Sequence, residues 1–397
     1  MVSAFAPDTQ SDPYPTYRTL REQDPVHYDA MMDGWILTRY DDVVAALKHP
    51  RFSADRRRAR NSVVQAALQA QAQAGPFSQA QTMLSSDPPD HTRLRNLASK
   101  AFTFKAVEAL RPRIQQIVDE LLDSVEAKGS LDVIWDLGYP LPVIVIAEML
   151  GVPAEQRDTF KRWSDDIVAN LGAMTSEATA QQGLKSAIEM AGYFRTIIAE
   201  RRRDPKDDLV SALVAAEERG DALSEEEVIA TCILLLAAGN ETTTNLIGNG
   251  TLALLRNPDQ LELFRAHPEL AESAVEELLR YDGPVQVTAR VALDDIEIDG
   301  KTVKEGQIAT CALAAANRDP AQFGNPDVLD ITRKENRHIA FGFGIHFCLG
   351  APLARAEAQI AFPALLRRFP RLALMGEPEW NGNFILRGLK ALPVEIS

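Results

Sequence analysis

One cysteine, Cys348, ends a short loop of aromatic and glycine residues just before a predicted helix over residues 350–368. The loop reads Phe341-Gly342-Phe343-Gly344-Ile345-His346-Phe347-Cys348-Leu349-Gly350. At a helix N-terminus a cysteine meets backbone N–H donors and the positive end of the dipole, and both favour the thiolate. A single thiolate here suits one soft metal ligand better than a nucleophile, because no histidine base with a carboxylate stands nearby. Taken alone, a lone cysteine is more often a small core residue.

Three glycines accompany this cysteine: Gly342, Gly344 and Gly350. They carry no side chain that would keep a ligand away from the backbone, so a flat ligand can approach closely. The loop therefore predicts a site for a flat ligand that is bound through Cys348.

A second unusual stretch lies in the middle of a long predicted helix. Ser224 with Glu227 forms a capping box, and the helix runs from there to about Arg256, roughly 48 Å at 1.5 Å per residue. Residues 229–239 are apolar on all sides, which indicates a buried helix. The run Ala238-Gly239-Asn240-Glu241-Thr242-Thr243-Thr244 then places polar groups in that interior. The alternative is a polar face turned to a water-filled seam.

Two features of this polar stretch point to function. Thr242 follows Ala238 by one turn, so its hydroxyl can reach the Ala238 carbonyl and bend the helix. A charged Glu241 is costly to bury unless it is paired. Polar groups placed against the local rules of a core often mark a functional site.

Two further pairs have helical spacing. His91 and Arg95 are four residues apart and share a helix face that can bind a carboxylate ligand, with a surface salt bridge as the alternative. Glu277 and Arg280 are three apart and can also pair. Asp90 is a candidate cap for the helix that carries His91.

Composition limits the class of protein. The 397 residues are 46 % hydrophobic, enough for a sizeable core, and a formal net charge of −14 argues against nucleic acid as a partner. Three cysteines without a CxxC pair exclude a disulfide framework and fit a reducing cytoplasm. The longest apolar runs, 141–147 and 229–239, are too short to span a bilayer, and no signal peptide is visible, so we expect a soluble protein without a membrane partner.

The remaining chain must position these groups, and its periodicity predicts a mainly helical protein with small sheets. Without a Gly-, Ser- or Pro-rich linker, we expect one domain over residues 1–397. Residues 51–84 lack a steady period and read as a long loop, and residues 172–175 read as a flexible cap over a pocket. Helices are expected over 13–23, 41–48, 107–127, 137–150, 153–171, 177–203 and 269–281, and strands over 26–28, 34–38, 285–291, 296–298, 308–312 and 392–396.

The cysteine loop resembles the haem-binding loop of the cytochrome P-450 family, and the resemblance extends over most of the chain. It implies the family fold, with haem b between the long central helix and the helix that follows Cys348, and Cys348 as the thiolate ligand of the iron. The residues that it implies for haem contact and for the propionates are His91, Arg95, Arg290, His346, Ala238, Phe341, Gly342 and Gly350.

The long helix resembles the oxygen-activating motif of that family. In this resemblance Ala238 and Gly239 make room for dioxygen, and Thr242 and Glu241 are catalytic through proton delivery. Glu277 and Arg280 resemble a buried structural pair whose third partner is an arginine in many members. Val328 stands at that place here, and Arg333 is a candidate substitute. The substrate-facing positions implied are Ala237, Ala238, Gln286, Val287, Thr288 and Ile385.

The implied activity is a monooxygenase that inserts one oxygen atom of O2 into a nonpolar small organic substrate. Electrons would come from an external ferredoxin and its reductase. The ferredoxin would dock on a patch formed by Arg93, Lys100 and Arg337. The protein itself is expected to be a monomer. The alternatives are a peroxide-driven haem-thiolate oxidase and a non-catalytic haem sensor or carrier. The presence of both Glu241 and Thr242 argues against them.

Overall fold

The computed structural model describes residues 11–30, 32–72, 79–169, 176–218 and 223–396. The cap predicted over residues 172–175 lies outside these ranges. Within them, helices dominate and the sheets are small, which confirms the predicted fold class. None of the helices has an apolar stretch that would carry it across a bilayer.

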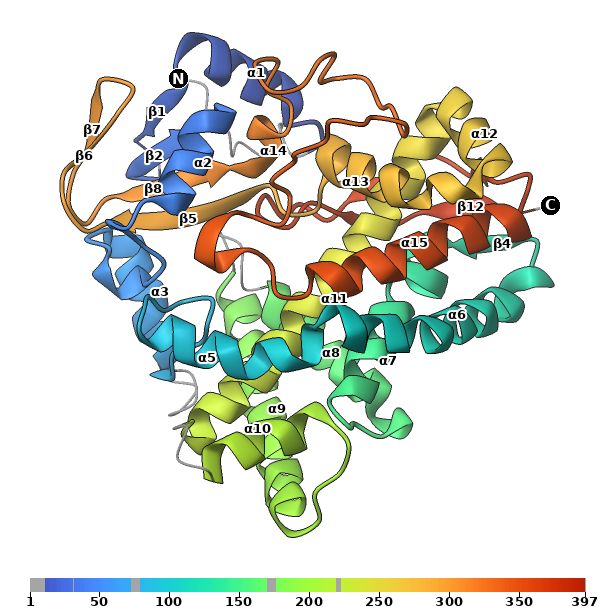
Figure 1. The fold of residues 1–397 in the computed structure, drawn as a ribbon, viewed down its shortest axis with the longest axis horizontal. Coiled ribbons are helices and arrows are strands. Elements are labelled where there is room, and N and C mark those ends of the chain that lie inside the picture. Colours follow the sequence, from blue (N-terminus) through green and yellow to red (C-terminus); the bar gives the residue numbers. More distant parts are fainter. Residues whose placement is uncertain (1–10, 31, 73–78, 170–175, 219–222, 397) are drawn as a thin grey trace.

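Figure 1 shows the helices, coloured from blue to red in their order along the chain. They are α1 (Tyr14–Gln23), α2 (Tyr40–Lys48), α3 (Ser62–Ala72), α5 (Asp90–Ala98), α6 (Phe104–Glu126), α7 (Pro140–Met149), α8 (Arg157–Val168), α9 (Glu177–Arg203), α10 (Leu209–Glu218), α11 (Glu225–Arg256), α12 (Pro258–Ala266), α13 (Ala271–Asp282), α14 (Leu313–Ala316) and α15 (Ala351–Arg368).

The largest sheet has five strands in the order β1-β2-β8-β5-β3. Its strands are β1 (Val26–Asp29), β2 (Gly34–Leu37), β3 (Phe52–Ser53), β5 (Val287–Ala292) and β8 (Ile308–Ala312). β2 and β8 are parallel, and the other neighbours are antiparallel. The smaller sheets are β4-β12-β9 (Ser130–Asp132, Pro393–Glu395, Ala373–Leu374), β6-β7 (Ile296–Ile298, Lys301–Val303) and β10-β11 (Glu379–Trp380, Leu389–Ala391).

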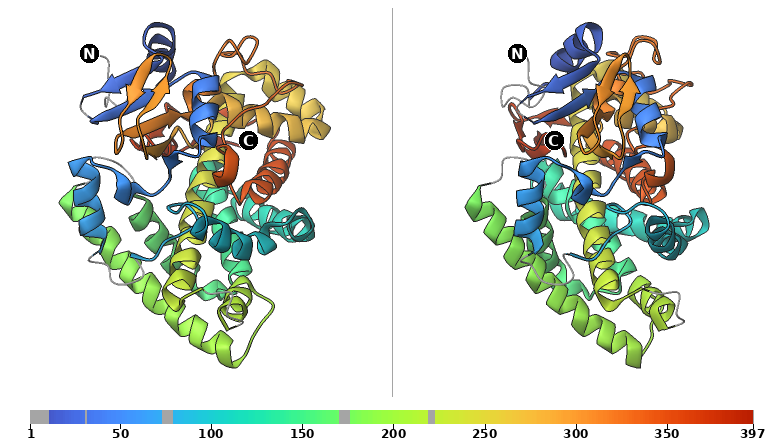
Figure 2. Two further views of the ribbon diagram at one scale, coloured as in Figure 1. Left: turned by 60° about the vertical axis from the view of Figure 1, so that its left-hand side comes forward. Right: turned by 90° about the vertical axis from the view of Figure 1, so that its left-hand side faces the viewer.

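The long helix α11 passes through the middle of the molecule, and Figure 2 shows it from two further sides. Its N-terminus has the predicted capping box, because Ser224 accepts from the Glu227 backbone and Glu227 accepts from the Ser224 backbone. It ends at Arg256, before Asn257 and Pro258. Helices α7, α8, α9, α13 and α15 pack against it. The prediction of a helix through the core is therefore confirmed.

Two of the buried apolar clusters border the cysteine loop, since Phe341 packs against one and Phe343 against the other. The larger cluster of buried apolar side chains joins α6, α7, α9, α11, α13 and α15. A smaller one lies between the five-stranded sheet and α2, with Val43, Leu37 and Ala309 among its fully buried members. The cysteine loop lies where the two cores approach, since Gly344 on the loop contacts Leu47 of α2 and the chain then enters α15.

Two expectations about these elements were wrong, and further helices were not predicted. Residues 51–84 are not one long loop, because they contain β3, a short 3-10 helix at Arg56–Arg58 and α3. Helices α10 and α12 were not expected, although Pro258 gives a good first turn for α12. Asp90 does not cap α5; it occupies the first helical turn and Pro89 precedes it.

Candidate functional site

The cysteine loop folds back so that Cys348 stands at the start of α15. The Cys348 backbone N–H donates to the Phe341 carbonyl at 2.9 Å. Gly342 and Gly344 both have φ of +73°, which L-residues rarely adopt. A Cβ on Gly344 would lie 2.9 Å from the Leu47 carbonyl oxygen. These two glycines are thus required by the turn itself, beyond the room for a ligand that the sequence suggested.

Gly350 is different, because its φ of −80° suits any residue. A Cβ built there would meet no atom within 4 Å. Open space therefore borders the backbone beside Cys348, as a flat ligand would require. The sequence prediction for Gly350 agrees with this geometry.

The surroundings of Cys348 act on its thiol in opposite directions. Burial raises the pKa of Cys348, whereas the backbone N–H groups of Gly350 and Ala351 and the charges of Arg95 and Arg355 oppose that rise. The expected helix-terminus effect is present, but burial outweighs it. A cation bound to the sulfur would shift the balance to the thiolate, because metal binding displaces the thiol proton.

The accessible positions at Cys348 and Ala238 suit a haem group between them. Cys348 is exposed although protein surrounds it, and Ala238 is exposed in the middle of α11, between buried residues. Helices α11 and α15 pack against each other, so the two open positions belong to neighbouring elements. Within the described ranges, no three His, Cys, Asp or Glu side chains gather to hold a bare metal ion. A metal carried in a planar organic ligand is consistent with one protein sulfur as its ligand.

Four nitrogen-bearing side chains converge from α5, the cysteine loop and β5. The rings of His91 and His346 lie 4.3 Å apart between centroids. Arg95 donates to the Phe347 carbonyl at 2.7 Å, and Arg290 donates to the Ala289 carbonyl at 2.8 Å. The resemblance assigned these four side chains to the haem propionates, and the fold brings them together.

This cluster of His91, Arg95, Arg290 and His346 lacks its counter-charges. Among the described residues, none of the four forms an ion pair with a carboxylate, and the buried Nε2 of His91 has no partner. Burial, followed by the charges of Arg290 and His91, lowers the pKa of His346 to about 3. Burial also lowers the pKa values of His91 and Arg290. Carboxylates placed among these groups would satisfy them, which fits the two propionates of haem.

On α11, the Thr242 hydroxyl donates to the Ala238 carbonyl at 2.8 Å, as predicted. The helix nevertheless continues from Glu225 to Arg256 without a break. Thr244 donates to the Gly138 carbonyl at 3.0 Å and so ties α11 to the segment before α7. Thr242 and Thr244 thus differ, since only the Thr244 hydroxyl is held from outside the helix.

No cation in the described parts of the chain lies within ion-pair distance of Glu241, and Asn245 donates to it at 3.2 Å. Burial raises the pKa of Glu241, the charge of Asp165 adds to the rise, and Asn245 and Lys161 oppose it. Lys161 lies 3.4 Å from Asp165 and over the Tyr139 ring at 3.3 Å. Glu241 therefore stands next to the lysine–carboxylate pair that Lys161 and Asp165 form on α8.

Sequence reasoning missed Glu357, a buried acid on α15. Its side chain is 2 % exposed, its Oε1 has no partner among the described residues, and a hydrogen bond joins it to Thr243 of α11. Burial raises the pKa of Glu357 to about 8, so it is protonated at neutral pH. An isolated glutamate inside a helix pattern gives no sign of burial, but its position nine residues after Cys348, on the helix that follows the cysteine loop, was a usable signal.

Sequence reasoning also missed a charged pair, Arg355 and Glu276, that lies against the cysteine loop. Arg355 on α15 donates to Glu276 on α13 at 2.7 Å and lies 4.6 Å from the centre of the Phe341 ring. Glu276 also lies 3.0 Å from His338. Burial opposes ionisation of Glu276, yet hydrogen bonds from Arg355 and His338 lower its pKa to about 2. Arg355 thus adds positive charge near Cys348 and holds Phe341 in place.

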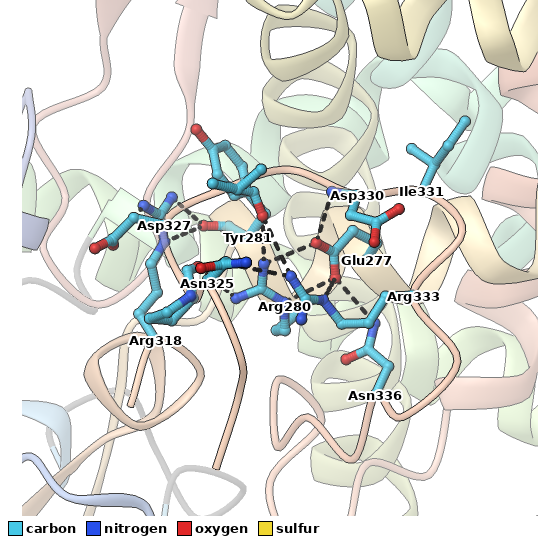
Figure 3. Close-up of polar contacts among 12 residues, drawn as sticks. Glu277, Arg280, Tyr281, Arg318, Asn325, Asp327, Asp330, Ile331, Arg333 and Asn336 are labelled. Carbon is cyan, nitrogen blue, oxygen red and sulfur yellow. Dashed lines mark hydrogen bonds and ion pairs between the residues drawn. The ribbon is translucent and has the colours of Figure 1, made fainter. Parts of the chain in front are cut away.

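Glu277 and Arg280 form the buried pair that the sequence suggested, and Figure 3 shows their partners. Both side chains are fully buried, and Arg280 donates to both Glu277 oxygens at 2.7 Å. Arg333 donates to Glu277 at 3.0 Å, which confirms it as the substitute for the arginine missing at Val328. Arg280 also bonds the carbonyls of Asn317, Pro326 and Val328. The network holds the loop after α14 against α13.

The predicted substrate-facing residues differ in accessibility. Ala238 is exposed, and Ala237, Thr288 and Ile385 are half-buried. Val287 is 6 % exposed, and Gln286 is 1 % exposed with its amide donating to the Gly283 carbonyl at 2.8 Å. Gln286 is therefore the least available of the set to a ligand, because its side chain serves the bend before β5.

The predicted docking patch for a ferredoxin has less uncompensated positive charge than the sequence suggested. Arg93 donates to Glu227 at 2.7 Å and to Asp90 at 3.2 Å, so acids compensate its charge. Lys100 and Arg337 are exposed.

Comparisons with known proteins agree with this geometry. The family described as Cytochrome P450 matches residues 33–383. Cytochrome P450 CYP107DY1 of Priestia megaterium is 46 % identical over 401 residues, covering 98 % of this chain and 97 % of that protein. The solved structure of P450BioI in complex with an acyl carrier protein ligated to hexadec-9Z-enoic acid has a TM-score of 0.91 at 41 % identity, over 98 % of this chain and 99 % of that one. The structure of myxobacterial CYP267B1 in complex with myristic acid has a TM-score of 0.92 at 41 % identity, over 99 % and 98 %.

The family match covers far more than half of the chain, and these relatives align along nearly their whole length. The sequence resemblance is therefore confirmed, with haem b as the cofactor and oxygen incorporation as the class of reaction. This chain belongs to the cytochrome P450 family of haem monooxygenases.

Proposed function

We propose that Cys348 is the axial thiolate ligand of haem b and that the enzyme inserts one oxygen atom of O2 into a nonpolar small organic substrate, by hydroxylation or epoxidation. The observation that carries this proposal is that Cys348 is accessible although protein surrounds it, at the start of the helix that packs against α11. Bound haem supplies an iron at which O2 is activated, with the thiolate favouring cleavage of the O–O bond.

His91, Arg95, Arg290 and His346 would bind the propionates. In support, these side chains converge without carboxylate partners among the described residues, and the His91 Nε2 is left unsatisfied. Phe341, Gly342 and Gly350 would contact the ring. Open space next to Gly350 supports that placement.

Glu241 and Thr242 would deliver protons on the opposite side of the haem, where Ala238 leaves room for oxygen. Burial raises the pKa of Glu241 and so favours its protonated form, and Lys161 with Asp165 would relay a proton from solvent to it. The Thr242 hydroxyl, which donates to the Ala238 carbonyl, would hold a proton beside the space that Ala238 leaves open. The presence of both groups favours an O2-dependent monooxygenase over a peroxide-driven oxidase or a haem sensor.

The substrate would lie against Ala237, Ala238, Val287, Thr288 and Ile385. Most of these side chains are apolar, which supports a nonpolar substrate. The relatives named above include one solved with a fatty acyl carrier protein and one with myristic acid. Those ligands were bound by those proteins, and for this chain they support only a substrate with an apolar chain or ring system.

The electrons would come singly from an external ferredoxin and its reductase, because no flavin or nicotinamide fingerprint is visible in the sequence. We further propose that the chain works as one domain and as a monomer in the cytoplasm. Size measurement of the purified haem protein, and turnover with a ferredoxin and ferredoxin reductase, test these points.

The central test replaces Cys348 by alanine. The reduced wild-type protein should give the far-red-shifted carbonyl band of a thiolate-ligated haem, and Cys348→Ala should lose it. Cys311→Ala is the matched control, since Cys311 is fully buried in the sheet core. Persistence of the band in Cys348→Ala would refute the ligand assignment.

A further inference from the structure

Three consecutive arginines, Arg56, Arg57 and Arg58, form a short 3-10 helix after β3. Arg57 donates to both carboxylate oxygens of Asp55, at 2.8 Å and 2.7 Å. Arg58 lies 3.9 Å from Asp55 and 3.9 Å from Asp87. Two of the three charges therefore have local carboxylate partners. In the described residues, no acid comes within ion-pair distance of Arg56.

Arg56 is nevertheless not an ordinary surface arginine. Its side chain is exposed, yet burial lowers the pKa of its guanidinium. Protein therefore lies around the guanidinium while part of its surface stays open. Cys348 has the same combination of exposure and burial. A charged group in such a place is costly unless an anion compensates it.

The fold places this open space beside the predicted substrate residues. β3 pairs with β5 through Ser53 and Val291, so the chain that follows Ser53 runs along β5 toward Thr288. The 3-10 helix packs against β5. Thr288 is half-buried, and Arg290 lies on the same face of the strand, 3.4 Å from the Thr288 hydroxyl.

Arg56 is also close enough to Arg290 for its positive charge to lower the Arg290 pKa. The propionates already have His91, Arg95, Arg290 and His346 as donors under the proposed function. Arg56 is therefore a positive charge that the proposed propionate contacts do not use, and it lies next to β5 at the edge of the proposed haem site. Neither the described residues nor the proposed propionate contacts place an anion next to Arg56.

We propose that Arg56 binds a carboxylate carried by the substrate, so that the enzyme takes apolar molecules that end in an acid group, such as fatty acids. The proposal rests on the proposed function. Arg56 would act as a specificity residue, with its guanidinium fork on the two carboxylate oxygens and the apolar chain extending past Thr288 toward the haem.

The test uses the haem-loaded protein, first checked for its carbonyl band so that failure of the haem assignment is seen separately. Decanoate, dodecanoate and myristate, each with its methyl ester and its alcohol, are titrated while the spin state of the haem is followed. The wild type should bind at least one acid about 10- to 100-fold more tightly than the matched ester, the range for one charge-assisted hydrogen-bond pair.

Variants assign this preference to one side chain. Arg56→Gln should bring the acid down to the affinity of the ester and leave ester binding unchanged, and Arg56→Lys should keep part of the preference. Arg60→Gln is the control, because Arg60 is exposed and paired with Glu305 at 2.8 Å on the surface. It should retain the full preference.

Three results would overturn the proposal. One is a wild type that binds no acid better than its ester. Another is an Arg56→Gln variant that keeps the preference for the acid. The third is an Arg56→Gln variant that loses haem on gel filtration with the acid-to-ester ratio unchanged, because Arg56 would then be a propionate ligand.

Discussion

Arg333 donates from its Nε to Oε2 of Glu277 at 3.0 Å, although 56 residues separate them along the chain. Arg280, one turn after Glu277, bonds the same carboxylate from the other side. Two guanidinium groups therefore hold one fully buried acid. The arrangement joins α13 to the loop that leads toward the cysteine.

Removal of Arg333 should destabilise the protein without touching the haem. Arg333→Ala leaves Glu277 buried with Arg280 as its remaining cation, so we expect a loss of roughly 2 kcal/mol, below the about 3–5 kcal/mol for a buried pair that is broken outright. Urea unfolding of the haem-loaded protein measures it. Lys334→Ala is the control, since Lys334 is exposed beside Arg333. Equal midpoints for the two variants would contradict the structural role of Arg333.

The Thr242 hydroxyl should matter for the use of electrons rather than for binding. Thr242→Ala should keep haem and substrate binding, while product per NADPH falls about 10-fold or more and peroxide rises, because a positioned proton donor is lost. Thr242→Ser keeps the hydroxyl and should stay close to wild type. Product, NADPH and peroxide are measured together. Unchanged coupling in Thr242→Ala would remove Thr242 from the catalytic set.

Glu357 should make stability depend on pH. Its pKa is raised from 4.5 to about 8 in the folded protein, so the folded state keeps a proton that the unfolded chain releases. The wild type should therefore lose stability as pH rises from about 5 to about 8, by up to about 1.4 kcal/mol per pH unit. Glu357→Gln should lack this slope.

Unfolding midpoints of the wild type and of Glu357→Gln across this pH range give the comparison. Glu272→Gln, a change at an exposed acid on α13, should follow the wild type. Parallel curves for the wild type and Glu357→Gln would show that Glu357 is ionised in the folded protein.

The turn before the cysteine should tolerate no side chain at Gly344. Gly344→Ala combines a φ of +73° with a Cβ placed 2.9 Å from the Leu47 carbonyl, so the loop must shift. We expect about 1–2 kcal/mol of backbone strain and faster haem loss to an acceptor protein. Gly324→Ala is the control, because a Cβ there meets nothing within 4 Å. Equal rates of haem loss would show that the loop adapts.

The sequence predicted well those features that depend on local pattern. The capping box at Ser224, the bounds of α9, and the bond from Thr242 to Ala238 all follow from residue types a few positions apart. Arg333 was also predicted as the partner of Glu277, because the place of the expected arginine was occupied by Val328.

The features that the sequence did not predict depend on distant contacts. Burial of Glu357 comes from the packing of α15 on α11, and neither helix indicates it alone. The position of Arg56 beside β5 comes from the pairing of β3 with β5, which the sequence around Arg56 does not show. Asp90 lies in the first turn of α5 and not at its cap, a shift of one residue that pattern reading does not resolve.

The parallel pairing of β2 with β8 has a consequence for how the protein is made. Gly34 lies opposite Ile308, so the hairpin of β1 and β2 has no neighbour until most of the chain has left the ribosome. During synthesis that hairpin presents an open strand edge, which other chains can capture. Production in the cell should therefore respond to chaperone supply and growth temperature more than the stability of the finished enzyme suggests.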